Sequence, residues 1–384
     1  MCVISFAPNT GRLFERWGLG EELMKVCTQH TNLHIHSHMG HLLQTQVLPQ
    51  KVFGSNSYNG RRGEIHAVLF EYAKRLGAEI KLGVEVTEYW ENDVEKKAGV
   101  IVQGQRIEGD VVVGADGVGS KARQLVLGHV DEPKPSGYAI YRTWFDIQER
   151  GVDKDPLTSM FAKEDLFFSW IGEDKHMLAM SMKGGKEMCW LLTHKDTADI
   201  KESWSQPGKI SDALTIVDDW DPRCRAIVSK ASFCIDFKLV IRDPLPTWVS
   251  PGGRIVVIGD AAHPFLPSSI QGASQGVEDG VALAVALKNA GKDKIPAATR
   301  VFEHLRYDRV LKSQQMGEST RNKWHKKNED KGDDVELPFP EWLLNFDAER
   351  HAQNTFGQIF DSLKEKGYAR PNVHLLYHID EAGA

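Results

Sequence analysis

The chain has 384 residues, of which 26% are charged and 41% hydrophobic, so it can bury a large core and form two lobes. Its net charge of −6 comes from interspersed signs, which argues against a nucleic-acid-binding surface. The five cysteines are odd in number and include no Cys-x-x-Cys pair, which favours reduced thiols and a cytoplasmic protein. No apolar run approaches the roughly 18 residues of a transmembrane helix, and Met1–Phe6 does not read as a signal peptide, so no membrane partner is expected.

The first informative feature of the chain is a run of alternating histidines. Asn32–Leu48 is expected to form strands, and His34, His36 and His38 would then share one face, as metal ligands sometimes do. No cluster of Asp, Glu or Cys accompanies them, so we expect a solvated strand face and no metal.

Arg62 begins an amphipathic helix with an apolar face of Ile65, Val68, Leu69, Tyr72 and Leu76. A cation in a first helical turn opposes the helix dipole, which favours another partner such as a phosphate.

The segment Gly109–Arg123, GDVVVGADGVGSKAR, predicts a buried strand at Val111–Val113 that ends in a Gly/Asp turn before a helix. Asp116 lies in that turn. Taken alone, such a turn is common, because Asp and Gly are frequent turn residues.

The next segment, about Pro133–Pro246, is rich in Trp and Phe and has short runs of alternating character. It is expected to form an antiparallel sheet with strands near Tyr138–Ile147, Leu166–Ile171, His176–Met182 and Met188–Leu192. Trp144, Phe168, Trp170 and Trp190 could line a pocket for a planar substrate, although core packing is the expected role of most of them.

The most informative segment is Arg254–Asp279, RIVVIGDAAHPFLPSSIQGASQGVED. The β-branched run Ile255–Ile258 predicts a strand buried on both faces, and Gly259-Asp260 places a carboxylate at its carboxyl end, where open α/β sheets bind ligands. Such a carboxylate can accept hydrogen bonds from a polyol. Gly272 and Ala273 then leave backbone amides uncovered at the start of a helix expected through Val277–Asn289, an environment that favours negative charge.

These motifs resemble those of the flavin-dependent aromatic hydroxylases of the p-hydroxybenzoate and salicylate hydroxylase type. The resemblance rests on Gly259-Asp260-Ala261-Ala262-His263-Pro264, Pro267, Gln271-Gly272-Ala273, Glu278-Asp279 and the Gly114-Ala115-Asp116-Gly117, Ser120, Arg123 motif. It implies FAD as cofactor and NAD(P)H as co-substrate. It also implies that Asp260 binds the ribityl chain, that Asp116 faces the pyrophosphate, and that Arg62 reaches the FAD.

The resemblance also defines what is absent. Flavin hydroxylases open with a βαβ unit that carries Gly-x-Gly-x-x-Gly, and this sequence contains no such motif. The first residues instead resemble the helix that follows the unit, so about 40 residues are expected to be missing. The expected fold class is therefore α/β (α+β): a Rossmann-like FAD-binding domain lacking its first βαβ unit, an antiparallel β-sheet substrate domain, and a helical C-terminus. Without the βαβ unit, we expect the chain to be poorly soluble or to hold no flavin.

The expected FAD-binding domain comprises residues 1–132 and 247–320, and the substrate domain comprises 133–246 with strands from about 32–48. Val301–Met316 is predicted as a long helix. Residues 321–384 are predicted to contain a charged linker at Lys323–Glu336, followed by a helical segment at Leu337–Lys364 that could join a homodimer contact.

The implied activity is monooxygenation of a phenolic or related aromatic or polyketide small molecule. It would use NAD(P)H and O₂ and proceed through a flavin C4a-hydroperoxide, a chemistry that the cofactor itself supplies. Related hydroxylases place an Arg toward the substrate at the position of Arg142, where it could bind a phenolate or carboxylate, although a surface strand Arg is as plausible. Two alternatives stay open, namely a shortened, catalytically impaired paralogue and a flavin epoxidase acting on a non-aromatic natural-product intermediate. Ile270 stands where a small residue or Gly commonly precedes Gln-Gly.

Overall fold

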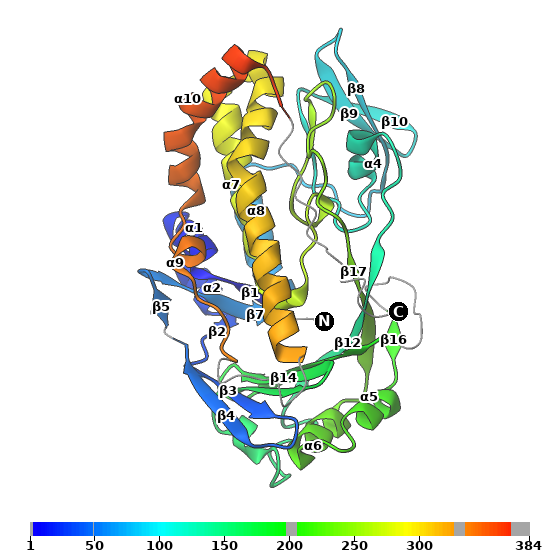
Figure 1. Cartoon of the computed structure of the whole chain (residues 1–384), viewed down its shortest axis with the longest axis vertical. Helices are drawn as coiled ribbons and strands as arrows, with labels where there is room; N and C mark the ends of the chain where they lie inside the picture. Colours follow the sequence, from blue (N-terminus) through cyan, green and yellow to red (C-terminus); the bar gives the residue numbers. More distant parts are fainter. Residues whose placement is uncertain (1–2, 49, 197–205, 326–334, 370–384) are drawn as a thin grey trace. The chain divides into compact units, whose positions relative to one another are not determined.

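The computed structural model describes residues 3–48, 50–196, 206–325 and 335–369 (Figure 1). The chain divides into two compact units, which are described separately. The first comprises Met1–Gly77, Pro135–Val240 and Glu318–Leu344, and the second comprises Ala78–Lys134, Ile241–Gly317 and Asn345–Ala384. The expected division into FAD-binding and substrate domains stays a prediction.

The first unit is built on an eight-stranded sheet with the order β16-β17-β12-β15-β14-β13-β3-β4. Its strands are β16 (Pro207–Gly208), β17 (Cys234–Ile241), β12 (Lys134–Asp146), β15 (Glu187–Lys195), β14 (Lys175–Met182), β13 (Phe167–Gly172), β3 (Asn32–Ser37) and β4 (Leu42–Val47). The four strands predicted after Pro133 are therefore confirmed, as are strands within Asn32–Leu48. β13 and β3 pair parallel, whereas the pairs β12–β15, β15–β14, β14–β13 and β3–β4 are antiparallel.

Smaller elements complete this unit. They are the three-stranded sheet β1 (Val3–Phe6), β7 (Tyr58–Arg61) and β2 (Cys27–Thr28), the hairpin β5 (Lys51–Val52) with β6 (Ser55–Asn56), and the helices α1 (Pro8–Arg16), α2 (Gly20–Met24), α3 (Arg62–Arg75), η1 (Ser159–Ala162), α5 (Ile210–Ile216), α6 (Pro222–Lys230) and α9 (Glu341–Leu344). One face of the large sheet packs on α5 and α6 in a core that includes Trp170, Trp190 and Ile227.

The second unit carries the acidic turns. A parallel pair, β11 (Val112–Gly114) and β18 (Ile255–Val257), lies beside α4 (Lys121–Leu127), α7 (Gly272–Ala290) and α8 (Ile295–His325). Of α8, the part up to Gly317 belongs to this unit. Figure 1 shows α7 and α8 side by side. The remaining elements are the antiparallel sheet β8 (Val86–Asn92), β9 (Lys97–Val102) and β10 (Gln105–Gly109), the short helices η2 (Gly259–Ala261), η3 (Pro267–Ser269) and η4 (Lys292–Lys294), and α10 (Ala348–Lys366). The sequence analysis did not predict the β8–β10 sheet.

Two strand predictions need correction. β18 is fully buried as expected but ends at Val257 instead of Ile258, and β11 is one residue later than predicted, with Val113 40% exposed. β11 pairs only with β18 among the described residues, and Val113 projects from a face of this narrow two-stranded sheet that is not fully covered.

The histidine face of β3 also differs from its prediction. The side chains do share one face, but the His36 ring stacks on Trp170 at 5.6 Å between centroids and is only 5% exposed, rather than solvated. Since imidazole can stack on aromatic rings, this face joins the aromatic core instead of meeting water. Burial lowers the pKa of His36, with Arg223 adding to the effect. No group of ligating side chains that could hold a metal is found among the described residues.

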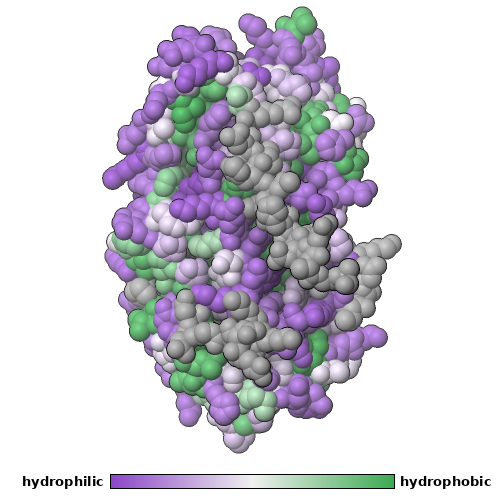
Figure 2. Space-filling view, viewed as in Figure 1, coloured by the Kyte–Doolittle hydropathy of each residue, from purple (hydrophilic) through white to green (hydrophobic). Residues whose placement is uncertain are grey.

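The C-terminal helices are confirmed, with different bounds. The long helix predicted at Val301–Met316 is part of α8, which continues to His325 and so includes the first three residues of the predicted linker. α9 lies within the segment predicted to be helical, and α10 begins in that segment and ends at Lys366. Most of the predicted linker, residues 326–334, lies outside the described residues. On the face shown in Figure 2, hydrophilic residues predominate and hydrophobic ones form separate patches. Within the described part of the chain, no helix is both long and apolar enough to cross a membrane.

Candidate active site

Asp260 follows the buried strand β18 in a tight turn. Gly259 has φ of 56°, a left-handed conformation that glycine adopts without steric cost, and its amide donates to Asp279 Oδ2 at 3.0 Å. Burial raises the pKa of the half-buried Asp260 carboxyl, while His263 and Arg123 oppose that shift. No donor among the described residues hydrogen-bonds this carboxylate, so it keeps its acceptor capacity for a ligand.

The amino end of α7 lies further along the same segment. The first hydrogen bond within the helix runs from the Gln275 amide to the Gln271 carbonyl at 2.8 Å, so the amides of Gly272 and Ala273 have no intrahelical partner. Both residues are only partly buried. A Cβ atom at Gly272 would lie 3.2 Å from Cβ of Phe265, so glycine suits this close approach. The 19-residue helix therefore presents backbone donors and the positive end of its dipole.

Asp116 lies at the corresponding turn after β11, where its carboxylate is occupied by donors from its own unit. Oδ2 accepts the amides of Lys121 and Ala122 at 2.8 and 3.1 Å and the hydroxyl of Tyr89 at 3.1 Å. Oδ1 accepts the hydroxyl of Ser120, which also caps α4. The carboxylate thus neutralises the amino end of α4 and fixes the turn. A direct role toward a pyrophosphate stays a prediction.

Arg123 joins the two acidic turns. Its side chain is buried, with Nη2 donating to the Asp260 carbonyl at 2.8 Å, Nε to the Ala261 carbonyl at 2.7 Å and Nη1 to the Val118 carbonyl at 2.8 Å. Burial and the nearby Arg242 lower the pKa of Arg123 to about 10, so the group stays cationic at neutral pH. Arg123 belongs to the Gly114–Arg123 motif, from which no role could be predicted for it, and the structure shows that it positions the backbone of Asp260.

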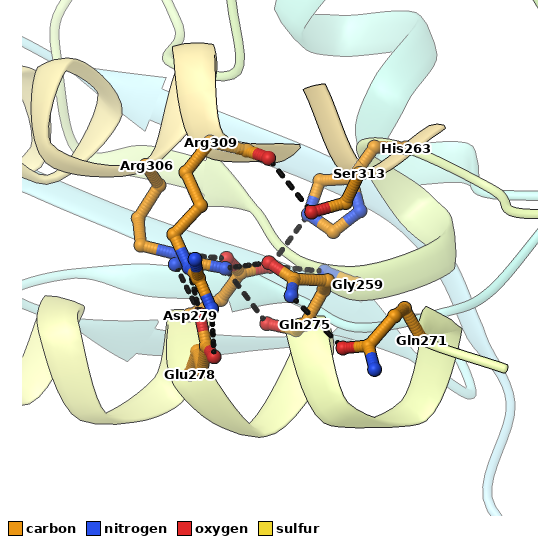
Figure 3. Close-up of polar contacts among 9 residues, drawn as sticks. All are labelled: Gly259, His263, Gln271, Gln275, Glu278, Asp279, Arg306, Arg309 and Ser313. Carbon is orange, nitrogen blue, oxygen red and sulfur yellow. Dashed lines mark hydrogen bonds and ion pairs between the residues drawn. The ribbon is translucent and has the colours of Figure 1, made fainter. Parts of the chain in front are cut away.

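A network of buried ion pairs between α7 and α8 supports the turn that contains Gly259 and Asp260 (Figure 3). Arg306 of α8 contacts Asp279 Oδ1 at 2.8 Å through Nε, Glu278 Oε2 at 2.5 Å through Nη1, and the Gln275 side chain at 2.6 Å through Nη2. Arg309 adds two contacts of 2.8 Å to Glu278. Glu278 and Asp279 are completely buried and Arg306 is 1% exposed. Every carboxylate in this network is therefore compensated by a cation.

Asp279 connects this network to the acidic turn. Its Oδ2 accepts the Gly259 amide and lies 2.6 Å from His263 Nε2, while Oδ1 contacts Arg306. Burial would raise the pKa of Asp279, but His263 and Arg306 outweigh that effect and hold it below its ordinary value. The network was missed from sequence. The available signal was a pair of adjacent acids on a helix that is otherwise largely apolar, since buried charges require partners.

Arg62 and Arg142 belong to the first unit. Arg62 is the exposed first residue of α3, as predicted, and Arg61 before it lies 5.8 Å from the Trp144 ring centroid. Arg142 of β12 is 9% exposed, with its guanidinium 4.9 Å from the centroid of Phe237. Arg142 is therefore not a surface residue. It shares a sheet face with Trp144, two residues away, and that face is lined by apolar side chains.

The aromatic residues considered for a substrate pocket lie on two faces of the sheet. Phe168, Trp170 and Trp190 belong to the core beneath α5 and α6, which confirms packing as their role. Trp144 lies in a separate apolar cluster with Met180 and Met182 and donates through Nε1 to Glu187 at 2.6 Å. Of the four, only Trp144 shares the face of Arg142.

A cavity of about 500 Å³ also lies within the first unit. Its lining includes Asp174, Lys175, His194 and Trp220, and it contains none of the predicted site residues. Lys195 and Asp174 neutralise each other there at 2.6 Å. With charges of both signs on its walls, this cavity indicates no particular ligand.

Comparisons with known proteins agree with these motifs. A family model described as "FAD binding domain" matches residues 5–298. The chain is 33% identical to the asperlicin C monooxygenase of Petromyces alliaceus, over 96% of this chain and 82% of that protein. It is 34% identical to the FAD-dependent monooxygenase fmqB of Aspergillus fumigatus, over 95% of this chain and 92% of that one.

Among solved structures, the chain is similar to CtdE in complex with FAD and a substrate. The two are 32% identical with a TM-score of 0.88, over 94% of this chain and 90% of CtdE. A salicylate hydroxylase substrate complex, 24% identical with a TM-score of 0.74 over 97% of this chain and 91% of that one, shares the fold.

Proposed function

We propose, on the premise that this chain belongs to the FAD-dependent monooxygenases, that it hydroxylates a phenolic or related aromatic small molecule with NAD(P)H and O₂. Membership of this family makes it an oxidoreductase with FAD as cofactor. The two relatives named above are fungal monooxygenases, and one of them is named for asperlicin C. The proposed aromatic ring of the substrate comes from the resemblance of this chain's motifs to those of the aromatic hydroxylases.

The observation that carries the proposal is the half-buried Asp260 carboxylate, which accepts no hydrogen bond from the described residues. It ends a fully buried parallel strand, where ligands of α/β sheets bind. Asp260 would hold the ribityl hydroxyls, and the amides of Gly272 and Ala273 would face the pyrimidine edge, where negative charge develops on reduction. The residues present therefore fit FAD at both places.

The other predicted contacts follow from residue chemistry. Arg62, exposed at the amino end of α3, would bind the FAD phosphate or ribityl chain. Asp116 would act through the turn that it fixes, because its carboxylate already accepts several donors. Bound FAD supplies the redox chemistry, taking a hydride from NAD(P)H and activating O₂.

Arg142 is proposed to bind and orient the substrate. A guanidinium on an apolar sheet face can pair with a phenolate or carboxylate far more strongly than an exposed one. Holding a phenol in its ionised form raises the electron density of the ring, which favours attack on an electrophilic oxygen. The nearby Trp144 would offer its ring to a planar substrate.

Flavin retention tests the proposal. In a form that carries the upstream βαβ unit, Asp260→Ala should abolish the yellow colour of the purified protein, because a lost charge-assisted hydrogen bond of about 1.5–3 kcal/mol weakens binding by roughly 10- to 150-fold. Asp293→Ala, which removes an exposed acid from the same unit, is the matched control and should keep flavin. An Asp260→Ala protein as yellow as its parent would refute the assignment. A parent that folds without flavin would favour the shortened, impaired paralogue.

A further inference from the structure

Ile270 has an unusual backbone conformation. Its φ and ψ are 52° and 21°, the left-handed region, and it lies between η3 and the amino end of α7. A β-branched residue is a genuine outlier there, because its branched Cβ crowds the backbone. Such a conformation costs on the order of 1–3 kcal/mol and persists only where the surroundings impose it.

Hairpin geometry does not explain this conformation. Five other non-glycine residues of the described chain have positive φ: Phe53, Lys96, Gln103, Asp174 and Lys183. Each lies in the connection of an antiparallel hairpin, where the twist of the strands demands positive φ. None of these five is β-branched. Ile270 alone combines the conformation with a β-branched side chain and a position outside any hairpin.

The flanking residues hold Ile270 in place. The Ser268 hydroxyl donates to the Gly317 carbonyl at 2.8 Å, and Ser269 packs so closely that a Cβ atom on Gly317 would lie 2.6 Å from Ser269 Cβ. The Ile270 amide donates to the Pro267 carbonyl at 3.0 Å. Ser269 and Gln271 are 5% and 3% exposed, whereas Ile270 is 38% exposed. The loop therefore buries both neighbours and presents the apolar side chain outward.

We propose that Ile270 packs against the reactive ring of the bound flavin and keeps water from the site of oxygen transfer. This inference rests on the proposed function, because it takes Gly272 and Ala273, two and three residues further on, as the cofactor's donors. Contact with water would not compensate the backbone strain of a partly exposed aliphatic side chain, whereas contact with a bound ligand would. A ligand beside those donors therefore explains why Ile270 adopts this conformation. Ile270 is then a specificity-determining residue that couples cofactor oxidation to hydroxylation.

The coupling can be stated as two balanced reactions. In the productive one, substrate–H, O₂, NAD(P)H and H⁺ give substrate–OH, H₂O and NAD(P)⁺. In the unproductive one, O₂, NAD(P)H and H⁺ give H₂O₂ and NAD(P)⁺, and the substrate is unchanged. Excluding water favours the first reaction. The amount of H₂O₂ formed per NAD(P)H oxidised therefore measures the shielding that we assign to Ile270.

Two substitutions separate shielding from packing. Ile270→Asn suits the left-handed conformation but is polar. Its thermal midpoint without flavin should therefore equal or exceed that of the parent, and it should still bind flavin, though less tightly because the apolar contact is lost. H₂O₂ per NAD(P)H should rise about threefold or more. Ile270→Val keeps the branched apolar side chain and should stay within about twofold of the parent. Gln103→Asn, at a left-handed hairpin position in the same unit, is the matched control and should leave coupling unchanged.

The outcomes are distinguishable. An Ile270→Asn enzyme that retains flavin and is fully coupled would overturn the inference, as would a loss of stability with unchanged coupling. Equal uncoupling in the Val variant would also overturn it, because that variant preserves the proposed shield. A parent that carries the upstream βαβ unit and folds but binds no FAD would refute the proposed function and this inference with it.

Discussion

Replacing Arg306 with Met should be the most damaging single substitution in the second unit. Arg306 is the cation shared by Glu278 and Asp279, and all three side chains are buried. Methionine fills much of the volume but leaves two carboxylates short of a partner. Removing one partner from a buried ion pair costs about 3–5 kcal/mol, chiefly because the remaining charge has been taken out of water.

The contacts that remain in Arg306→Met indicate where in that range the loss of stability should lie. Glu278 would keep both contacts to Arg309, so most of its compensation survives. Asp279 would keep only the Gly259 amide and His263. We therefore expect a loss of about 3–4 kcal/mol, toward the lower end of the range, and a drop of about 6 °C or more in the thermal midpoint.

Lowering the pH should reduce the difference in stability between the parent and Arg306→Met. In the parent, the pKa of Asp279 is held below its ordinary value, so its contribution is complete above the unfolded pKa of about 3.9 and is lost as pH falls through the lower folded value. In Arg306→Met, burial is opposed by fewer cations, so Asp279 should take up its proton at higher pH. The destabilisation should therefore be larger at pH 7 than at pH 5.

The assay is urea unfolding followed by circular dichroism at both pH values, together with the absorbance of bound flavin. Flavin retention should also weaken, since Asp279 holds the turn that carries Asp260. Lys312→Met, at an exposed position on the same helix, is the matched control and should change stability little. A loss below about 1 kcal/mol in Arg306→Met, or a loss independent of pH, would refute this reasoning.

Three further predictions concern the first unit. Arg142→Ala should sharply reduce hydroxylation while bound FAD is retained, and Arg142→Lys should rescue it only partly because it lacks the planar fork; unchanged turnover would remove Arg142 from the substrate site. Burial, with His325 adding, lowers the pKa of His176 to about 3, so the unfolded chain binds a proton that the folded chain does not between about pH 3 and 6.5. Stability should fall with acid across that window, and His176→Gln should flatten the slope measured by urea unfolding; an unchanged slope would contradict this. Gly185→Ala should cost about 1–3 kcal/mol, since Gly185 has φ of 71° and a Cβ atom would lie 2.6 Å from the Ala162 carbonyl oxygen; a neutral effect on the thermal midpoint would count against the strain.

The sequence by itself determined the features that depend on local patterns. Alternation located the strands around Arg142, and the run Ile255–Ile258 followed by Gly-Asp located a buried strand with a carboxylate at its end. The alternation repeats every two residues and the apolar run is continuous, so both can be recognised without knowledge of distant partners. Local signals also placed Arg62 at the start of α3, whereas α7 begins at Gly272, before the predicted start at Val277.

Only the tertiary structure decided which partners each side chain meets. Arg306 reaches Asp279 across 27 positions and Arg123 reaches the Asp260 carbonyl across 137, and no periodicity encodes such pairs. The same holds for the face that Trp170 occupies and for the burial of His36 against it. A buried charge or ring is stabilised by whatever packs around it, and that environment exists only when distant segments of the chain come together.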